Sequence, residues 1–91
     1  MKQIILNADD FGRHTLINRA VEEGVARGIL RSATIMPGSA AFDDAAALAR
    51  RTPALGVGIH LTLVNGNPVL PPSEIPSLVT EAGASSTITR R

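Results

Sequence analysis

The feature that most constrains the fold is the segment over residues 55–63 (LGVGIHLTL), which is apolar at almost every position. A strand with one solvated face alternates apolar and polar residues, whereas a strand covered on both faces is apolar along its length. Strands of the second kind are typical of parallel sheets, whose connections place helices on the sheet faces. The segment therefore predicts a buried strand in an α/β fold.

The residues before this segment supply the remaining elements. Short apolar runs at residues 2–7 and 31–36 predict two further strands. Apolar residues at helical spacing predict a helix over residues 15–27 and a second from residue 39 or 40 to residue 51. The order is β-α-β-α-β with short connections, which predicts one α/β layer built from right-handed crossovers.

Polar residues and glycines punctuate these elements. Residues 8–13 (ADDFGR) predict a turn after the first strand. Thr15 is expected to cap the first helix and Gly28 to end it in a left-handed conformation. On that helix the expected apolar face carries Leu16, Ile17, Ala20, Val21, Gly24 and Val25, and the expected polar face carries Asn18, Arg19, Glu22 and Glu23. Asp43 and Asp44 fall in the first turn of the second helix, where the helix dipole favours acids, and are interpreted as structural.

The C-terminal third has weaker patterns. Residues 65–76 contain four prolines and predict a loop, and residues 77–82 are compatible with the start of a helix. Residues 84–91 show neither helical nor strand periodicity and are expected to be a disordered tail. Three parallel strands leave both sheet edges open, so the chain is expected to be the first third of a larger domain.

Composition excludes several classes of protein. The 91 residues hold 9 Lys plus Arg against 8 Asp plus Glu, and 2% are aromatic, so no basic, base-stacking surface for nucleic acid is expected. The absence of cysteine excludes disulfides, thiolate metal sites and a cysteine nucleophile. The first apolar run is broken too soon by aspartates to be a signal peptide or membrane span, and a cytoplasmic protein is expected.

Candidate functional residues follow from the rule that active sites of parallel α/β folds lie at the carboxyl ends of the strands. The end of the first strand offers Asn7, Asp9 and Asp10, and the end of the third offers His60 and Thr62. The end of the second strand, Met36 and Pro37, is chemically quiet. Two acids and a histidine are therefore expected to converge on one rim.

The adjacent residues Asp9 and Asp10 can have different roles. Successive residues of an extended chain point to opposite sides, so one carboxylate can bind a metal while the other faces a substrate water. The imidazole of His60 favours zinc and transition metals, and a carboxylate accepts magnesium or manganese. A catalytic metal takes about three protein ligands. Asp10 and His60 supply two, and His14 is the one further histidine in the sequence.

Structural interpretations of the same residues remain open. Asp9 and Asp10 precede a helix and would also stabilise its N-terminus. His60 in an apolar strand would also suit a core histidine, and His14 a solvated position. Gly56 and Gly58 alternate in the third strand, which predicts close approach of a helix or substrate. The sequence contains no nucleophile elbow, Walker loop or dinucleotide-binding glycine motif, which disfavours serine hydrolases, P-loop enzymes and dinucleotide binding.

Several motifs in register resemble one family. The chain is similar to the YdjC-like carbohydrate deacetylases, which include chitooligosaccharide deacetylases, and most similar to the branch associated with hopanoid biosynthesis. The resemblance covers residues 1–83 and is carried by residues 6–12 (LNADDFG), Asn18, 28–30 (GIL), 32–36 (SATIM), 56–63 (GVGIHLTL) and 66–69 (GNPV).

The resemblance implies a (β/α) barrel-like fold and metal-dependent deacetylation of N-acetylated sugars. It implies that Asp9 is the general base and that Asp10 and His60 are metal ligands. The implied metal is magnesium, with zinc as the chemical alternative. A third ligand and a general acid would be histidines further downstream, which this sequence does not contain.

The sequence departs from the family beyond Gly83, which suggests a truncation or frameshift and puts catalysis by the chain alone in doubt. The alternative is a non-catalytic α/β module that forms homo-oligomers through its open sheet edge. A phosphatase-like enzyme is a weaker alternative, because no phosphate-binding loop is present.

Overall fold

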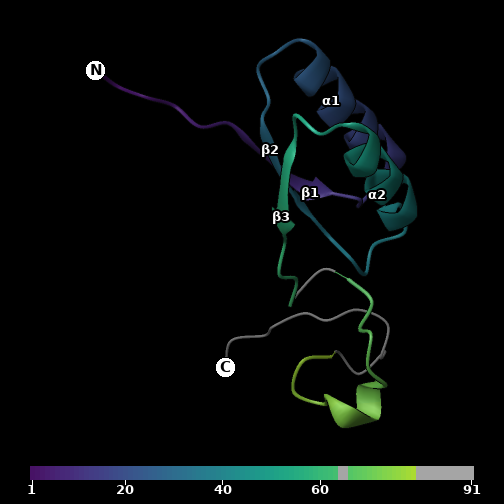
Figure 1. The fold of residues 1–91 in the computed structure, drawn as a ribbon. Helices are drawn as coiled ribbons and strands as arrows, with labels where there is room; N and C mark the ends of the chain where they lie inside the picture. Colours follow the sequence, from purple (N-terminus) through teal and green to yellow (C-terminus); the bar gives the residue numbers. More distant parts are fainter. Residues whose placement is uncertain (64–65, 80–91) are drawn as a thin grey trace. The chain divides into compact units, whose positions relative to one another are not determined.

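The computed structural model describes residues 1–63 and 66–79. The elements follow in the order β1 (Asn7–Phe11), α1 (Thr15–Ala26), β2 (Ser32–Ile35), α2 (Phe42–Arg51), β3 (Gly56–Ile59) and a 3-10 helix (Pro72–Glu74) (Figure 1). The predicted order β-α-β-α-β is confirmed. The chain divides into two compact units, Met1–His60 and Leu61–Arg91, which are described separately.

The three strands of the first unit form one parallel sheet in the order β1-β2-β3. β2 is the central strand. It pairs with β1 through Asn7–Ser32 and Ala8–Ala33, and with β3 from Ser32–Gly56 to Ile35–Ile59. The expected parallel α/β layer is therefore present.

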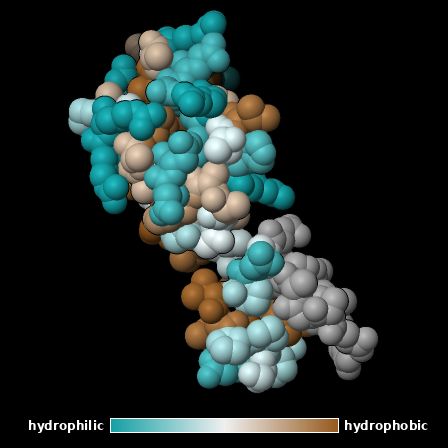
Figure 2. All heavy atoms as spheres, turned by 90° about the vertical axis from the view of Figure 1, so that its right-hand side faces the viewer, coloured by the Kyte–Doolittle hydropathy of each residue, from teal (hydrophilic) through white to brown (hydrophobic). Residues whose placement is uncertain are grey.

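Both helices cover the same side of this sheet (Figure 1). The side chains of Ala33 and Ile35 on β2 are buried on that side. Figure 2 views the molecule from the side on which the helices lie, and the outer surface of the helices is mainly hydrophilic. Since side chains alternate along a strand, Ser32 and Thr34 of β2 face the side of the sheet opposite the helices. The core consists of Phe11, Val21, Ala33, Ile35, Ala45, Leu48 and Leu55.

The first strand lies later in the sequence than expected. The predicted strand over residues 2–7 and turn over residues 8–13 were wrong, because β1 spans Asn7–Phe11. Ile4 and Ile5 are 84% and 88% exposed, whereas the side chain of Phe11 is fully buried in the core. Pairing with β2 and burial of Phe11 set the strand position, and the isoleucine run has no such partner among the described residues.

The ends of α1 follow local rules. The N-cap is His14 rather than the predicted Thr15, and its Nδ1 accepts a hydrogen bond from the backbone N–H of Leu16 at 3.0 Å. At the other end Gly28 has φ +79°, as predicted. Its N–H donates to the carbonyl of Val25, and that of Ile29 to the carbonyl of Gly24, which is the Schellman pattern.

The remaining first-unit elements are shorter than predicted. α2 begins at Phe42, and Asp43 and Asp44 lie in its first turn as expected. β3 is confined to Gly56–Ile59 and is exposed at all four residues, so the prediction of a buried strand over residues 55–63 was wrong, because β3 is an edge strand of the described sheet. His60 follows the strand directly. A Cβ at Gly58 would lie 3.7 Å from Cγ2 of Thr34, which is ordinary contact. Close approach by another described segment therefore does not explain this glycine.

The second unit is described over residues 61–63 and 66–79. Its 3-10 helix begins at Pro72, within the predicted loop. Residues 77–79 form a turn and bend rather than an α-helix, and the rest of that predicted helix lies outside the described residues. The tail over residues 84–91 lies outside them too. No helix in the described part of the chain is long and apolar enough to cross a bilayer.

Candidate active site

The candidate site is built on an irregularity in β1. Ala8 pairs with Ala33 and Phe11 with Ile35, so two residues of β1, Asp9 and Asp10, stand opposite the single residue Thr34. This is a β-bulge, and Asp10 adopts a left-handed conformation with φ 61°. Such a backbone is uncommon for a residue other than glycine, although aspartate tolerates it better than most. The bulge gives the two carboxylates different neighbours.

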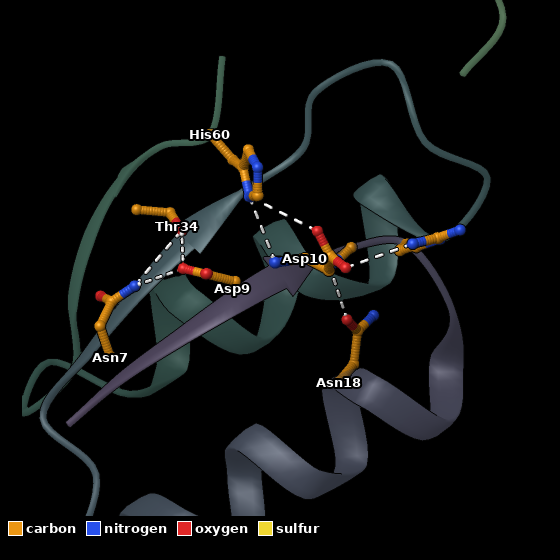
Figure 3. A network of polar contacts seen from close by, with 8 residues as sticks. Asn7, Asp9, Asp10, Asn18, Thr34 and His60 are labelled. Atoms are coloured by element: carbon orange, nitrogen blue, oxygen red, sulfur yellow. Dashed lines mark hydrogen bonds and ion pairs between the residues drawn. The ribbon is translucent and has the colours of Figure 1, made fainter. Parts of the chain in front are cut away.

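Asp10 meets His60 across the sheet. Nδ1 of His60 lies 3.6 Å from Oδ1 of Asp10 and accepts a hydrogen bond from the backbone N–H of Asp10 at 3.3 Å (Figure 3). The backbone N–H of His60 donates to the carbonyl of Ile35 at 2.8 Å, which fixes the histidine beside β2. The His60 side chain is 30% exposed, so it lies at the sheet rim rather than in the core. The predicted convergence is therefore present for this pair.

The second oxygen of Asp10 faces Arg13. Nη1 of Arg13 lies 3.3 Å from Oδ2, and the Arg13 backbone N–H donates to the Asp10 carbonyl at 3.0 Å. The two side chains are 52% and 36% exposed, so solvent screens this ion pair. Arg13 is thus a counter-charge to a candidate ligand and contributes little to stability.

Asp9 has a separate set of partners. Its Oδ1 accepts hydrogen bonds from Nδ2 of Asn7 at 2.9 Å and from Oγ1 of Thr34 at 3.3 Å. Figure 3 shows Asp9 turned toward these two residues and Asp10 turned toward His60. Asp9 and Asp10 thus have separate neighbours, and Thr34 is a participant that the sequence analysis missed.

Asn18 organises the loop behind the site. The prediction that it lies on the polar face of α1 was wrong, since its side chain is 1% exposed. Its Oδ1 accepts from the backbone N–H of Gly12 at 2.8 Å, and its Nδ2 donates to the Ala41 carbonyl at 3.1 Å and to Oδ2 of Asp44 at 2.8 Å. One amide therefore connects the loop after the bulge to the start of α2. The spacing of Asn18, three residues before the buried Val21, was the available signal.

The face of α1 toward the core is rotated relative to the prediction. Leu16, expected inside, is 73% exposed, whereas Val21 is buried. Hydrophobic spacing alone did not predict this rotation. The buried face includes Asn18, whose hydrogen-bond partners Gly12 and Asp44 can be identified only from the folded structure.

The other predicted candidates have different positions. His14 caps α1 through Nδ1 and lines a surface groove with Asp43 and Asp44, so it does not join Asp10 and His60. Thr62 belongs to the second unit.

The side chains of Asp10 and His60 have the donor atoms, and nearly the spacing, that a divalent cation requires. Two donors each about 2.1 Å from one ion lie roughly 3.0–3.5 Å apart. Oδ1 of Asp10 and Nδ1 of His60, at 3.6 Å, approach that spacing, and a cation on Nδ1 would replace the hydrogen bond that this nitrogen accepts from the backbone N–H of Asp10. Imidazole with carboxylate suits zinc and transition metals, and the carboxylate suits magnesium. Within residues 1–63 and 66–79 no group of three such side chains is present, so the pair fits as two of about three protein ligands.

A family model and individual relatives all match this chain over most of its length. The family model described as "YdjC-like protein" matches residues 3–89. A carbohydrate deacetylase of Enterococcus faecalis (strain ATCC 700802 / V583) is 42% identical over 85 residues, which cover 90% of this chain and 32% of that protein. A chitooligosaccharide deacetylase of Salmonella paratyphi B is 45% identical over 75 residues, which cover 82% and 29%.

A solved structure shares the fold as well. A crystal structure from Enterococcus faecalis V583, of a candidate cellobiose-phosphate cleavage protein, matches with a TM-score of 0.81 and 41% identity. The match covers 90% of this chain and 33% of that one. The chain thus spans about a third of the length of the relatives it matches. The match to the family model extends over nearly the whole chain, and the chain therefore belongs to the YdjC-like protein family.

Proposed function

We propose that this chain carries part of the active site of a metal-dependent deacetylase acting on N-acetylated sugars. The observation that carries the proposal is the contact between Asp10 and His60, which brings a carboxylate and an imidazole together at the sheet rim. Relatives named carbohydrate deacetylase and chitooligosaccharide deacetylase support the reaction class.

Each residue has a distinct role in this proposal. Asp10 and His60 would hold the divalent cation, magnesium by family resemblance and zinc as the chemical alternative. Such a cation supplies Lewis acidity at the acetamide carbonyl and makes water more acidic. Asp9 accepts the proton of the attacking water as general base. Its separate hydrogen-bonding neighbourhood leaves it outside the Asp10–His60 pair.

The substrate class favoured by the relatives is a chitooligosaccharide-like chain, because one relative is named a chitooligosaccharide deacetylase. A hopanoid-linked N-acetylated sugar is the alternative substrate. Acetate release from N-acetylglucosamine oligomers and from a lipid-linked N-acetylglucosamine distinguishes the two.

A hybrid enzyme tests the reaction. The matching N-terminal segment of the Enterococcus faecalis carbohydrate deacetylase is replaced by this chain, with which it is 42% identical. We expect cation-dependent acetate release that Asp9→Asn, Asp10→Asn and His60→Ala each lower by about a hundredfold or more. Asp9→Asn removes the proposed general base, and the other two substitutions each remove a proposed cation ligand. Asp43→Asn, at an exposed acid in the first turn of α2, is the matched control. Full activity of Asp9→Asn in a hybrid that Asp43→Asn also leaves active would refute the proposal.

A non-catalytic module is the second candidate. Val57 and Ile59 of β3 are 39% and 60% exposed, and β3 ends the described sheet, which favours association through that strand. Size-exclusion chromatography of the 91-residue chain separates the candidates. A defined oligomer without cation binding favours the module, whereas cation binding that depends on Asp10 favours the partial active site.

A further inference from the structure

Three side chains on the side of the sheet opposite the helices form a closed hydrogen-bonded triangle. Nδ2 of Asn7 donates to Oδ1 of Asp9 at 2.9 Å and contacts Oγ1 of Thr34 at 3.4 Å, and Oγ1 of Thr34 lies 3.3 Å from the same Asp9 oxygen (Figure 3). The hydroxyl can therefore accept from Asn7 while it donates to Asp9. All the donors converge on one oxygen of one carboxylate.

The backbone explains why these three meet. Asn7 precedes Asp9 by two residues, so both side chains fall on one face of β1. Thr34 is the single β2 residue opposite the bulge, and its neighbours Ala33 and Ile35 are buried on the helix side. Thr34 must then face the side opposite the helices, as Asp9 does. The bulge thereby brings a hydroxyl from the neighbouring strand to the first of the two aspartates.

The two oxygens of the Asp9 carboxylate have different contacts. Both hydrogen bonds end on Oδ1, and within the described residues Oδ2 has no hydrogen-bond partner. We propose that Asn7 and Thr34 are positioning residues that fix the Asp9 side chain in one rotamer, with Oδ2 directed to the reacting water. The assignment rests on the proposed function, in which Asp9 is the general base.

The effect expected from this triangle is measurable. Loss of one hydrogen bond changes a side-chain rotamer equilibrium by up to about tenfold. The Asp9 side chain is exposed, so few packing contacts would otherwise hold it in place. Its rotamer distribution is therefore expected to follow the presence of the Thr34 hydroxyl.

The experiment measures the Asp9 side-chain rotamer directly in the 91-residue chain. Three-bond couplings from the backbone nitrogen and carbonyl carbon of Asp9 to its Cγ report χ1 in isotopically labelled protein. We expect single-rotamer couplings in the parent chain, averaged couplings in Thr34→Val, and recovery in Thr34→Ser, which keeps the hydroxyl. Ser32→Ala is the matched control, because the Ser32 hydroxyl lies on the same side of β2 but donates to the Leu6 carbonyl.

Each result decides the assignment. Single-rotamer couplings in a folded Thr34→Val chain would overturn it, as would averaging in Ser32→Ala of the same size as in Thr34→Val. Should Thr34→Val lose its dispersed amide spectrum, Asn7→Ala at the exposed start of β1 carries the same test with the same criterion. The couplings require neither cation nor turnover. A hybrid enzyme that tolerates Asp9→Asn would therefore remove the proposed function without altering this measurement.

Discussion

Nδ1 of His60 lies 3.6 Å from Oδ1 of Asp10 and accepts the backbone N–H of that same aspartate at 3.3 Å. Nδ1 therefore uses its one lone pair on the backbone of Asp10, and a cation bound at Nδ1 would displace this hydrogen bond. The bulge takes Asp10 out of register with β2 and makes its N–H available to the histidine. One backbone irregularity therefore positions both members of the pair.

The first prediction concerns cation binding by the 91-residue chain. Asp10→Asn and His60→Ala each remove one of the two proposed ligands and are expected to weaken Mn²⁺ or Zn²⁺ binding by about tenfold or more. Binding by the parent chain is itself expected to be weak, since a catalytic site takes about three protein ligands. Isothermal titration calorimetry measures the change. Equal affinities for the parent, both variants and the Asp43→Asn control would contradict the ligand assignment.

The second prediction concerns the backbone at Asp10. A left-handed conformation costs alanine roughly 1 kcal/mol or more relative to glycine. We therefore expect Asp10→Gly to be about 1 kcal/mol more stable than Asp10→Ala, although both lack the carboxylate and should bind cations equally poorly. Urea unfolding measures the difference. At the exposed helical residue Arg19 the order should reverse, with alanine more stable than glycine by about 1 kcal/mol. The same order at both positions would argue against the left-handed conformation.

The sequence predicted elements whose signals are local. The amphipathic pattern before Gly28 located α1, and the glycine itself identified the Schellman end of the helix. The alternation of strands and helices was enough for the parallel α/β topology. The rule that sites lie at strand ends predicted that Asp10 and His60 lie close together, and their side chains are 3.6 Å apart in the structure.

Features that depend on tertiary pairing could not be predicted in this way. The isoleucine run at residues 2–6 has more strand propensity than Asn7–Phe11, yet burial of Phe11 places β1 over the aspartates. A bulge accommodates them, and no local signal predicts which β2 residue will face it. Asn18 was misplaced for a similar reason, because its burial is compensated by hydrogen bonds with Gly12 in the preceding loop and with Asp44, which lies 26 residues away.

The third prediction concerns the Asn18 network. Asn18→Ala leaves the buried backbone N–H of Gly12 without its partner and removes one of the two hydrogen bonds to the Ala41 carbonyl, which still accepts from Ala45. We therefore expect a loss of about 2–3 kcal/mol in the free energy of unfolding. Asn18→Asp should also destabilise, because it places a second carboxylate where the amide now donates to Asp44 at 2.8 Å. The double variant Asn18→Asp/Asp44→Asn restores a donor–acceptor pair. A favourable coupling energy of about 1 kcal/mol or more is expected from the double-mutant cycle, and strict additivity would exclude this contact as a stabilising one.

The fourth prediction concerns Arg13, whose guanidinium lies 3.3 Å from Oδ2 of the proposed ligand Asp10. Because the ion pair is exposed, Arg13→Gln should change the free energy of unfolding by less than about 1 kcal/mol. Removing a cation beside the ligand should nevertheless tighten divalent cation binding several-fold at low ionic strength, since two like charges about 4 Å apart in water repel by about 1 kcal/mol.

Salt dependence separates this electrostatic effect from a change in ligand orientation. The gain from Arg13→Gln should shrink as the ionic strength rises from about 0.01 M to 1 M, where the screening length falls from about 30 Å to 3 Å. Arg19→Gln, which removes a cation paired with Glu22 on α1, is the matched control and should leave affinity unchanged at every salt concentration. Weaker binding in Arg13→Gln at low salt would mean that the guanidinium orients the Asp10 carboxylate and does not oppose the cation.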